Sequence, residues 1–297
     1  MIEKIKKLAQ KRNAIILAHN YQPPEIQDIA DLCGDSLELS IKASQTNADV
    51  IVFCGVHFMA ETACILCPDK KVLLPKSDAG CPMADMVTEK QLSEKIKELP
   101  SVSIVTYVNS SAAVKALSSI CCTSANVVNI VEKIDSNEIL MIPDKNLASY
   151  AASKTSKKIH LWNGYCPFHD SLTPEDVYAA KKEHPDALFI AHPECRKEVL
   201  DLADAVLSTS GMIHYTSQSD ASSFIIGTEI GILYPLKKEN PDKNFYPANS
   251  KKMECADMKK IKLDDVLRSL EFMEGEVTVP EDIRKKALNA VKLMLQF

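Results

Sequence analysis

The sequence predicts an α/β protein built from three copies of one four-stranded unit. Short β-rich runs alternate with helical stretches along the chain, which is typical of parallel α/β architecture. Corresponding runs recur roughly 85 to 88 residues apart. Polar residues follow the strands at similar spacings in each copy. We therefore expect three four-stranded parallel sheets flanked by helices, with further helices at both ends of the chain.

The expected strands form sets of three, with one member from each copy. The first set is 14–19, 103–107 and 187–192, and the second is 50–55, 138–144 and 224–229. A third set is 71–75, 158–162 and 244–248, and a weaker fourth is 31–36, 119–124 and 204–209. Terminal helices are expected at 2–12, 264–273 and 280–297. The copies divide the chain into domains 1–98, 99–184 and 185–297.

Each copy carries polar residues at three equivalent positions. Ligands of open parallel sheets bind beyond the carboxyl ends of the strands, near helix N-termini. If the three units meet around a pseudo-threefold axis, these residues could face one central cavity. They are the triplets His19-Asn20-Tyr21, Tyr107-Val108-Asn109 and His192-Pro193-Glu194, the hydroxyls Ser36, Ser124 and Thr209, and the cysteines Cys81, Cys166 and Cys255.

These residue types indicate acid–base and anion-binding chemistry. Glu194 is the best candidate for a general base, since burial can raise the pKa of a carboxylate. His19 and His192 can position carboxylates or move protons, and Tyr21 and Tyr107 can donate protons. The three hydroxyls either bind carboxylates or cap helices. Their recurrence at equivalent positions favours binding.

Three of the ten cysteines stand in loop-like contexts that suit a soft metal. Cys81, Cys166 and Cys255 could bind zinc together with His169, or an iron–sulfur cluster that leaves one iron open. The spacing leaves both alternatives open. The other cysteines are expected to pack as apolar residues, including the pair Cys64 and Cys67 at a helix end and the adjacent Cys121 and Cys122. Cys195, beside the third triplet, lies closer to the expected site.

The composition argues against several classes of function. A net charge of −5 disfavours broad binding to nucleic acid or to acidic membranes. The first residues lack the apolar stretch of a signal peptide, and no run reaches transmembrane length. We therefore expect a cytoplasmic protein with reduced cysteines and small-molecule substrates.

Several motifs resemble those of the quinolinate synthase family. They include ILAHNYQ (16–22), GDSLELS (34–40), GCPMAD (80–85), YVNSSA (107–112), CCTSAN (121–126), LWNGYCPFH (161–169), AHPEC (191–195), STSGM (208–212) and CADMKK (255–260). The resemblance implies three homologous αβα domains around a pseudo-threefold axis, with the active site at the centre. It also implies one [4Fe–4S] cluster per chain, held by Cys81, Cys166 and Cys255.

The reaction implied by this resemblance condenses iminosuccinate with dihydroxyacetone phosphate to give quinolinate, phosphate and water for NAD biosynthesis. Transient coupling to the enzyme that supplies iminosuccinate is possible. Tyr21 matches a mobile tyrosine that helps to close the site. The implied contacts to iminosuccinate are His19, Ser36, Tyr107, Asn109, Ser124, His192, Glu194 and Thr209.

Two other functions fit some of the same residues. One is a zinc-dependent lyase or hydrolase that uses the three cysteines with His169. The other is a non-catalytic iron–sulfur sensor that binds a partner protein. A sensor has no need for the ring of histidine, tyrosine, glutamate and hydroxyl side chains.

Overall fold

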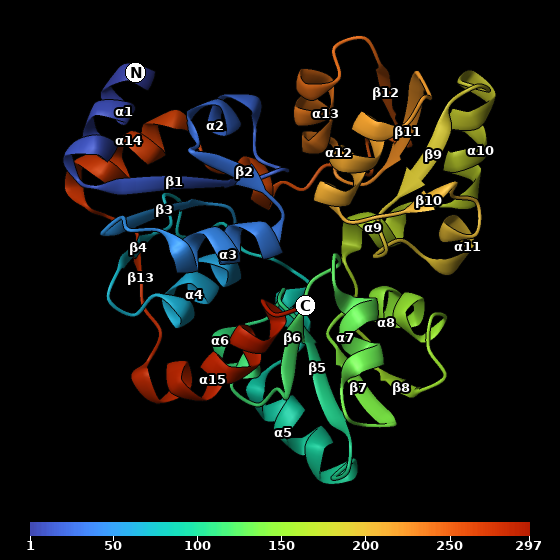
Figure 1. Ribbon diagram of the computed structural model, residues 1–297, viewed down its shortest axis with the longest axis horizontal. Coiled ribbons are helices and arrows are strands. Elements are labelled where there is room, and N and C mark those ends of the chain that lie inside the picture. The colour runs from blue at the N-terminus through green and yellow to red at the C-terminus, as the bar shows by residue number, and fades with distance from the viewer.

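The computed structural model describes all 297 residues as three lobes placed around a common centre (Figure 1). Each lobe is built on one sheet, and the expected α/β class is confirmed. Numbered along the chain within each lobe, the four expected strands have the same order, 2-1-3-4, and all pair in parallel. The repeat inferred from spacing is therefore also a repeat of topology.

The first lobe contains the sheet β2-β1-β3-β4 and the helices around it. The strands β1 and β3 are apolar and almost wholly buried, as expected for a parallel sheet covered on both faces. The elements are α1 (Ile2–Lys11), β1 (Ala14–His19), α2 (Pro24–Ile29), β2 (Leu32–Gly34), α3 (Ser36–Gln45), β3 (Val50–Cys54), α4 (His57–Leu66), β4 (Lys71–Leu73) and the 3₁₀ turn η1 (Ala84–Met86).

The second lobe contains the sheet β6-β5-β7-β8. Its elements are α5 (Glu89–Glu98), β5 (Ser103–Tyr107), α6 (Ala112–Lys115), β6 (Ile120–Cys122), α7 (Val127–Lys133), β7 (Glu138–Ile142), α8 (Lys145–Ala152), β8 (Lys158–Leu161) and α9 (Pro167–Ser171).

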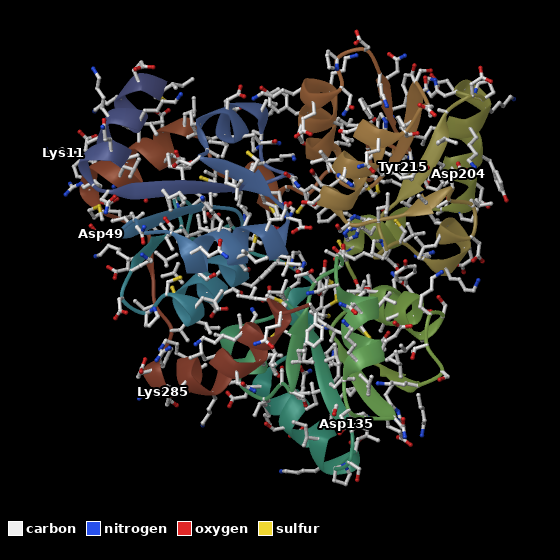
Figure 2. All side chains as sticks on the ribbon, viewed as in Figure 1. Lys11, Asp49, Asp135, Asp204, Tyr215 and Lys285 are labelled. Atoms are coloured by element: carbon white, nitrogen blue, oxygen red, sulfur yellow. The ribbon has the colours of Figure 1, made fainter.

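The third lobe contains the sheet β10-β9-β11-β12. Its elements are α10 (Pro174–Glu183), β9 (Leu188–Ala191), α11 (Lys197–Leu200), β10 (Ala205–Val206), α12 (Thr209–Gln218), β11 (Ser223–Gly227), η2 (Ile230–Ile232), α13 (Leu233–Glu239), β12 (Asn244–Pro247) and η3 (Asp257–Lys259). Charged side chains such as Lys11, Asp135 and Lys285 lie on the outside of the molecule, away from the junction of the lobes (Figure 2).

The C-terminal segment returns to the first two lobes (Figure 1). Helix α14 (Leu263–Phe272) packs on α1, and β13 (Glu276–Val277) adds an antiparallel fifth strand beside β4. Helix α15 (Glu281–Met294) packs on α4, α6 and β6. The expected terminal helices are thus present. The domain bounds stay a prediction, and the segment assigned there to the third domain lies against the other two lobes.

One glycine lets this segment pass close to the first sheet. Gly275 has a φ of +84°, a region that L side chains rarely adopt, and its carbonyl accepts a hydrogen bond from the N–H of Leu74 at 2.8 Å. A Cβ at this position would lie 2.3 Å from the carbonyl oxygen of Leu74. None of the helices in the protein combines the length and apolar character that a membrane crossing requires.

Because α15 packs against both the first and the second lobe, its buried face should contribute to the stability of the whole protein. Met294 lies fully buried on that face, and its carbonyl accepts a hydrogen bond from Asn126 at 2.9 Å. We expect Met294→Ala to lower the free energy of unfolding by about 2–5 kcal/mol, the usual range for a buried methionine. Urea unfolding measures this, with the exposed Lys292→Ala as control. Equal effects of both variants would contradict the packing described here.

Candidate active site

A cavity lies where the three lobes meet, and residues of all three lobes line it. The structure brings every predicted site residue to its wall. His19, Tyr21, Ser36 and Cys81 come from the first lobe, Tyr107, Asn109, Ser124 and Cys166 from the second, and His192, Glu194, Thr209 and Cys255 from the third. Each lobe thus supplies four of the residues, and their individual roles stay predictions.

The carboxyl-end rule for parallel sheets explains how the chain brings these residues together. His19 and Tyr107 are the last residues of β1 and β5, and His192 directly follows β9. These three strands occupy equivalent places in sheets of identical order. Their carboxyl ends all point to the junction of the lobes, so the side chains that follow them meet there.

The site hydroxyls are not the helix caps. Asp35 caps α3, where it accepts hydrogen bonds from the N–H groups of Leu37 and Glu38 at 2.9 and 3.0 Å. Ser208 caps α12 in the same way. Ser36 and Thr209 are instead the first residues inside these helices, and both line the cavity. Their hydroxyls are therefore placed for contacts other than capping.

The third hydroxyl and Thr209 take part in contacts between lobes. Ser124 Oγ of the second lobe lies 3.1 Å from Nε2 of His192 in the third. Thr209 Oγ1 of the third lobe accepts a hydrogen bond from the side-chain amide of Asn20 in the first, at 3.2 Å. Asn109 also lines the cavity, and its buried Oδ1 has no hydrogen-bond partner in the protein. An unpaired buried acceptor of this kind is available to a ligand.

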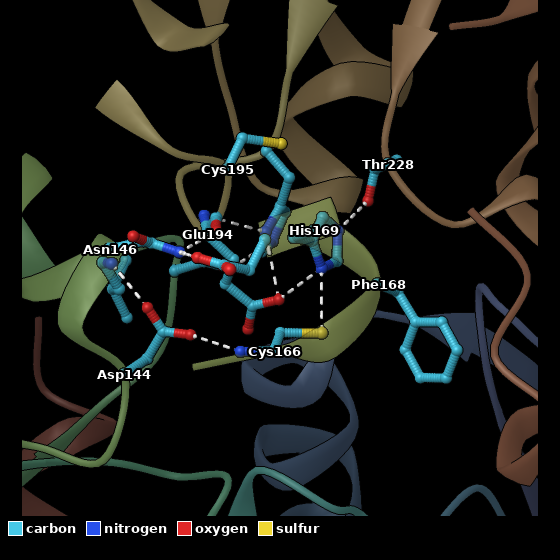
Figure 3. Close-up of polar contacts among 12 residues, drawn as sticks. Asp144, Asn146, Cys166, Phe168, His169, Glu194, Cys195 and Thr228 are labelled. Atoms are coloured by element: carbon cyan, nitrogen blue, oxygen red, sulfur yellow. Dashed lines mark hydrogen bonds and ion pairs between the residues drawn. The ribbon is translucent and has the colours of Figure 1, made fainter. Parts of the chain in front are cut away.

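Glu194 is at the centre of the polar network (Figure 3). Its Oε2 lies 2.7 Å from Nδ1 of His169 and 3.6 Å from Nδ1 of His192. The same Nδ1 of His169 is 3.1 Å from Cys166 Sγ, and its Nε2 is 2.8 Å from the hydroxyl of Thr228. The Thr228 hydroxyl in turn is 2.6 Å from the phenol of Tyr21. A continuous hydrogen-bonded chain thus connects Tyr21 with Glu194.

The pKa of Glu194 differs from the expectation. Burial alone would raise it, but the imidazoles of His169 and His192 and the hydrogen bonds of His169 and Tyr107 lower the pKa below its ordinary value. Burial lowers the pKa of His19 and of His192 to about 3. Glu194 is therefore ionised at neutral pH, while His19 and His192 are neutral. The upward shift expected from burial is wrong for Glu194, since its partners outweigh desolvation.

The two tyrosines of the site keep their protons. Burial, and then the nearby charge of Glu194, raise the pKa of Tyr21 and of Tyr107 well above the ordinary value. Both phenols lie in the cavity wall and are less than a tenth exposed. They can therefore donate hydrogen bonds to a bound ligand throughout the neutral range.

The spacing of the three cysteines distinguishes a single ion from a larger group. Thiolates around one tetrahedral zinc lie about 3.8 Å apart, as follows from Zn–S bonds of about 2.3 Å. Cys81, Cys166 and Cys255 do not form a group whose sulfurs all lie within 4.8 Å, although all three line the same cavity. At least one pair of these sulfurs is therefore farther apart than two thiolates on one zinc ion.

A second set of possible ligands is closer together but is already paired. Cys166, His169 and Glu194 have ligand atoms within 4.8 Å of one another. Nδ1 of His169 faces both the Glu194 carboxylate and the Cys166 sulfur. This geometry suits a proton shared among three groups. His169, considered only beside zinc in the sequence, is thus a central member of the hydrogen-bonded network.

The remaining cysteines of interest lie outside the cavity. The thiol of Cys64 donates to the carbonyl of Val277 and that of Cys67 to the carbonyl of Ala43, so they do not face each other as a redox pair. Cys121 and Cys122 are buried on β6. Cys195 is fully buried, and its sulfur lies 3.4 Å from the carbonyl of Gly227.

Two buried carboxylates near the cysteines were missed in the sequence. Asp144 accepts a hydrogen bond from the N–H of Cys166 at 3.0 Å, and Glu229 accepts one from the N–H of Cys255 at 3.1 Å. Each stands two residues beyond the third strand of its copy, β7 or β11, where the first copy has Val56 after β3. This recurrence is the signal that could have revealed them.

Comparison with known proteins identifies the family. The family model described as quinolinate synthetase A protein matches residues 3–296. The quinolinate synthase of Geotalea uraniireducens is 58% identical over 291 residues, which cover 98% of this chain and 95% of the relative. Those of Thermodesulfovibrio yellowstonii and Methanosarcina barkeri are each 55% identical and cover 99% of this chain and 97% of the relative. The chain therefore belongs to the quinolinate synthetase A family of enzymes.

Proposed function

We propose that this enzyme condenses iminosuccinate with dihydroxyacetone phosphate to give quinolinate, phosphate and water for NAD biosynthesis. The observation that carries the proposal is the single cavity to which each lobe contributes polar side chains and one cysteine. Membership of the quinolinate synthetase A family supports it. Because imines hydrolyse in water, we also propose transient coupling to the enzyme that supplies iminosuccinate.

Cys81, Cys166 and Cys255 would hold a [4Fe–4S] cluster in this reaction. Their place in the wall of one cavity, with one cysteine from each lobe, supports a cluster with three protein ligands. When bound, such a cluster offers one iron without a protein ligand as a Lewis acid toward a substrate oxygen or nitrogen.

The protein itself would bind the carboxylates of iminosuccinate. Ser36 and Thr209 begin α3 and α12, whose helix dipoles favour negative charge at these ends. The neutral imidazoles of His19 and His192, the amide of Asn109 and the hydroxyl of Ser124 add hydrogen bonds around the same cavity. These contacts would orient the substrate and exclude water.

Proton transfer would involve Glu194 and the two phenols. Ring closure requires protons to leave carbon atoms, and the Glu194 carboxylate is ionised and hence able to accept one. Its contact with His169 gives the accepted proton a path along Thr228 to Tyr21. Tyr107, whose hydrogen bond helps to lower the pKa of Glu194, is a second proton donor in the cavity wall.

The first prediction of the proposed function concerns the metal. Anaerobically prepared protein should contain about four irons and four sulfides per chain, the content of one [4Fe–4S] cluster. Cys81→Ala, Cys166→Ala or Cys255→Ala should each lose the cluster and activity. Cys67→Ala is the control, because its thiol donates to Ala43 outside the cavity. A colourless protein with one zinc per chain would instead support the zinc-dependent lyase or hydrolase.

The second prediction concerns the base. Glu194→Gln keeps the shape of the side chain but cannot accept a proton. We expect kcat for quinolinate formation to fall by roughly 10²- to 10⁴-fold, the usual scale of general acid–base catalysis, with iron content unchanged. Steady-state kinetics and iron analysis on the same sample measure both. A variant with unaltered kcat would remove Glu194 from the mechanism.

The third prediction separates substrate binding from helix capping with two adjacent residues. Thr209→Ala should weaken quinolinate binding by roughly 10- to 150-fold, as expected when a hydrogen bond to a charged group is lost. Ser208→Ala, which removes the cap of α12, should lower stability by about 1 kcal/mol and leave affinity nearly unchanged. Titration with quinolinate and urea unfolding of both variants test this. The reverse pattern would show that Thr209 does not contact the ligand.

A further inference from the structure

A buried ion pair of the third lobe lies beside the cavity, and its lysine reaches the first lobe. Lys259 Nζ lies 2.8 Å from Oε1 and 3.0 Å from Oε2 of Glu229. The Glu229 side chain is 1% exposed and that of Lys259 is 19% exposed. Pairs this far from water are screened weakly, and removing one partner leaves the other charge uncompensated.

Each member of the pair also holds a separate loop. Glu229 Oε1 accepts a hydrogen bond from the N–H of Cys255, and its Oε2 accepts one from the N–H of Gly231 at 2.7 Å. Lys259 donates to the backbone carbonyl of Tyr21, which belongs to the first lobe. The ion pair therefore connects the loop of Cys255, a predicted cluster ligand, with the loop of Tyr21, a predicted proton donor.

The loop that carries Tyr21 fits closely against the third lobe at this point. A Cβ on Gly231 would lie 2.5 Å from the Tyr21 carbonyl oxygen and 2.7 Å from Lys259 Nζ, so only glycine leaves room for the contact. The side-chain amide of Gln27 bonds the carbonyls of Asn20, Gln22 and Gly231 at 3.1, 2.8 and 3.2 Å. The Tyr21 backbone is thus held at several points beside its phenol's contact with Thr228.

The second lobe offers an internal comparison. Asp144 occupies the position equivalent to Glu229 and likewise accepts a hydrogen bond from the N–H of its cysteine, Cys166. Its other oxygen accepts from the N–H of Leu147 at 2.7 Å, within its own lobe. Asp144 therefore anchors a cysteine loop without a lysine that reaches the Tyr21 loop. The link to Tyr21 is an additional feature of Glu229 and Lys259.

We propose that Glu229 and Lys259 are positioning residues that tie the Tyr21 loop to the Cys255 loop. The pair holds the Tyr21 phenol at Thr228, so that the proton donor and the third cysteine keep a fixed relation across the lobe junction. Its effect on turnover depends on the proposed function. The mechanical link between the two loops does not.

Hydrogen–deuterium exchange tests the link directly. In Lys259→Met, backbone amides of residues 19–22 should exchange about 10-fold faster, the change expected when a hydrogen bond from a charged group is lost. The control is Lys252→Met, which removes an ion pair to Asp176 inside the third lobe, away from the cavity. Unchanged exchange at 19–22 in Lys259→Met would overturn the proposal.

Two further variants guard against a folding defect. The double variant Glu229→Gln/Lys259→Met removes both charges and leaves neither unpaired, so it should fold yet still exchange faster at 19–22. Lys259→Arg, which can keep the ion pair, should restore much of the protection. A folded double variant with wild-type exchange would equally count against the link.

Turnover adds a readout that a purely structural role would not change. The comparison uses Lys259→Met samples whose iron content and melting temperature match those of the wild type. In these samples kcat should fall more than KM changes, because the substrate contacts remain and the proton donor is displaced. An equal effect of Lys252→Met on kcat would contradict this role. If the wild-type enzyme forms no quinolinate, the proposed function fails while the exchange experiment still decides whether the loops are linked.

Discussion

The pairing of Glu194 with His169 is the contact on which the rest of the site depends. A carboxylate in so buried a place is tolerated only when other groups satisfy it, and here the main partner comes from a different lobe. The side-chain amide of Asn146, also from the second lobe, bonds the Glu194 carbonyl at 3.1 Å. Nearby, Arg196 of the third lobe pairs with Asp170 of the second at 2.8 Å. The need to satisfy these polar groups fixes how the lobes sit against each other.

The three repeated lobes form the cavity, and the residues that differ between the repeats make the cavity asymmetric. The three sheets have the same topology, and the carboxyl ends of their first strands meet at the cavity. The chemical types of the residues at these strand ends differ between the copies. The first and third copies supply an imidazole where the second supplies the phenol of Tyr107. Only the third copy supplies a carboxylate from its triplet, Glu194. An unsymmetrical substrate can be held in one orientation because the chemical groups around it are unsymmetrical.

The sequence was sufficient to predict the fold and to bring the predicted site residues to one cavity. The spacing of the strands and the position of polar residues at their carboxyl ends are local features, and they repeat three times along the chain. The sequence did not reveal contacts between residues that lie far apart along the chain. The pKa of Glu194 falls because of His169, which only tertiary structure brings within 2.7 Å. Glu229 and Lys259 look like ordinary surface charges in sequence, yet they are paired at the junction of the lobes. The amphipathic pattern of α15 indicates a buried face without indicating which lobe it covers.

The antiparallel strand β13 has a consequence for how the protein is made. Glu276 of β13 pairs with Leu73 of β4 in the sheet of the first lobe. This sheet therefore receives its fifth strand only after about 200 further residues have been synthesised. At a translation rate of roughly 5–20 residues per second, this delay is about 10–40 s. During that time the outer edge of β4 has no strand beside it, and an uncovered edge can pair with other chains. The first lobe to leave the ribosome is therefore the last to be completed, and a chaperone that shields the nascent chain would act during this interval.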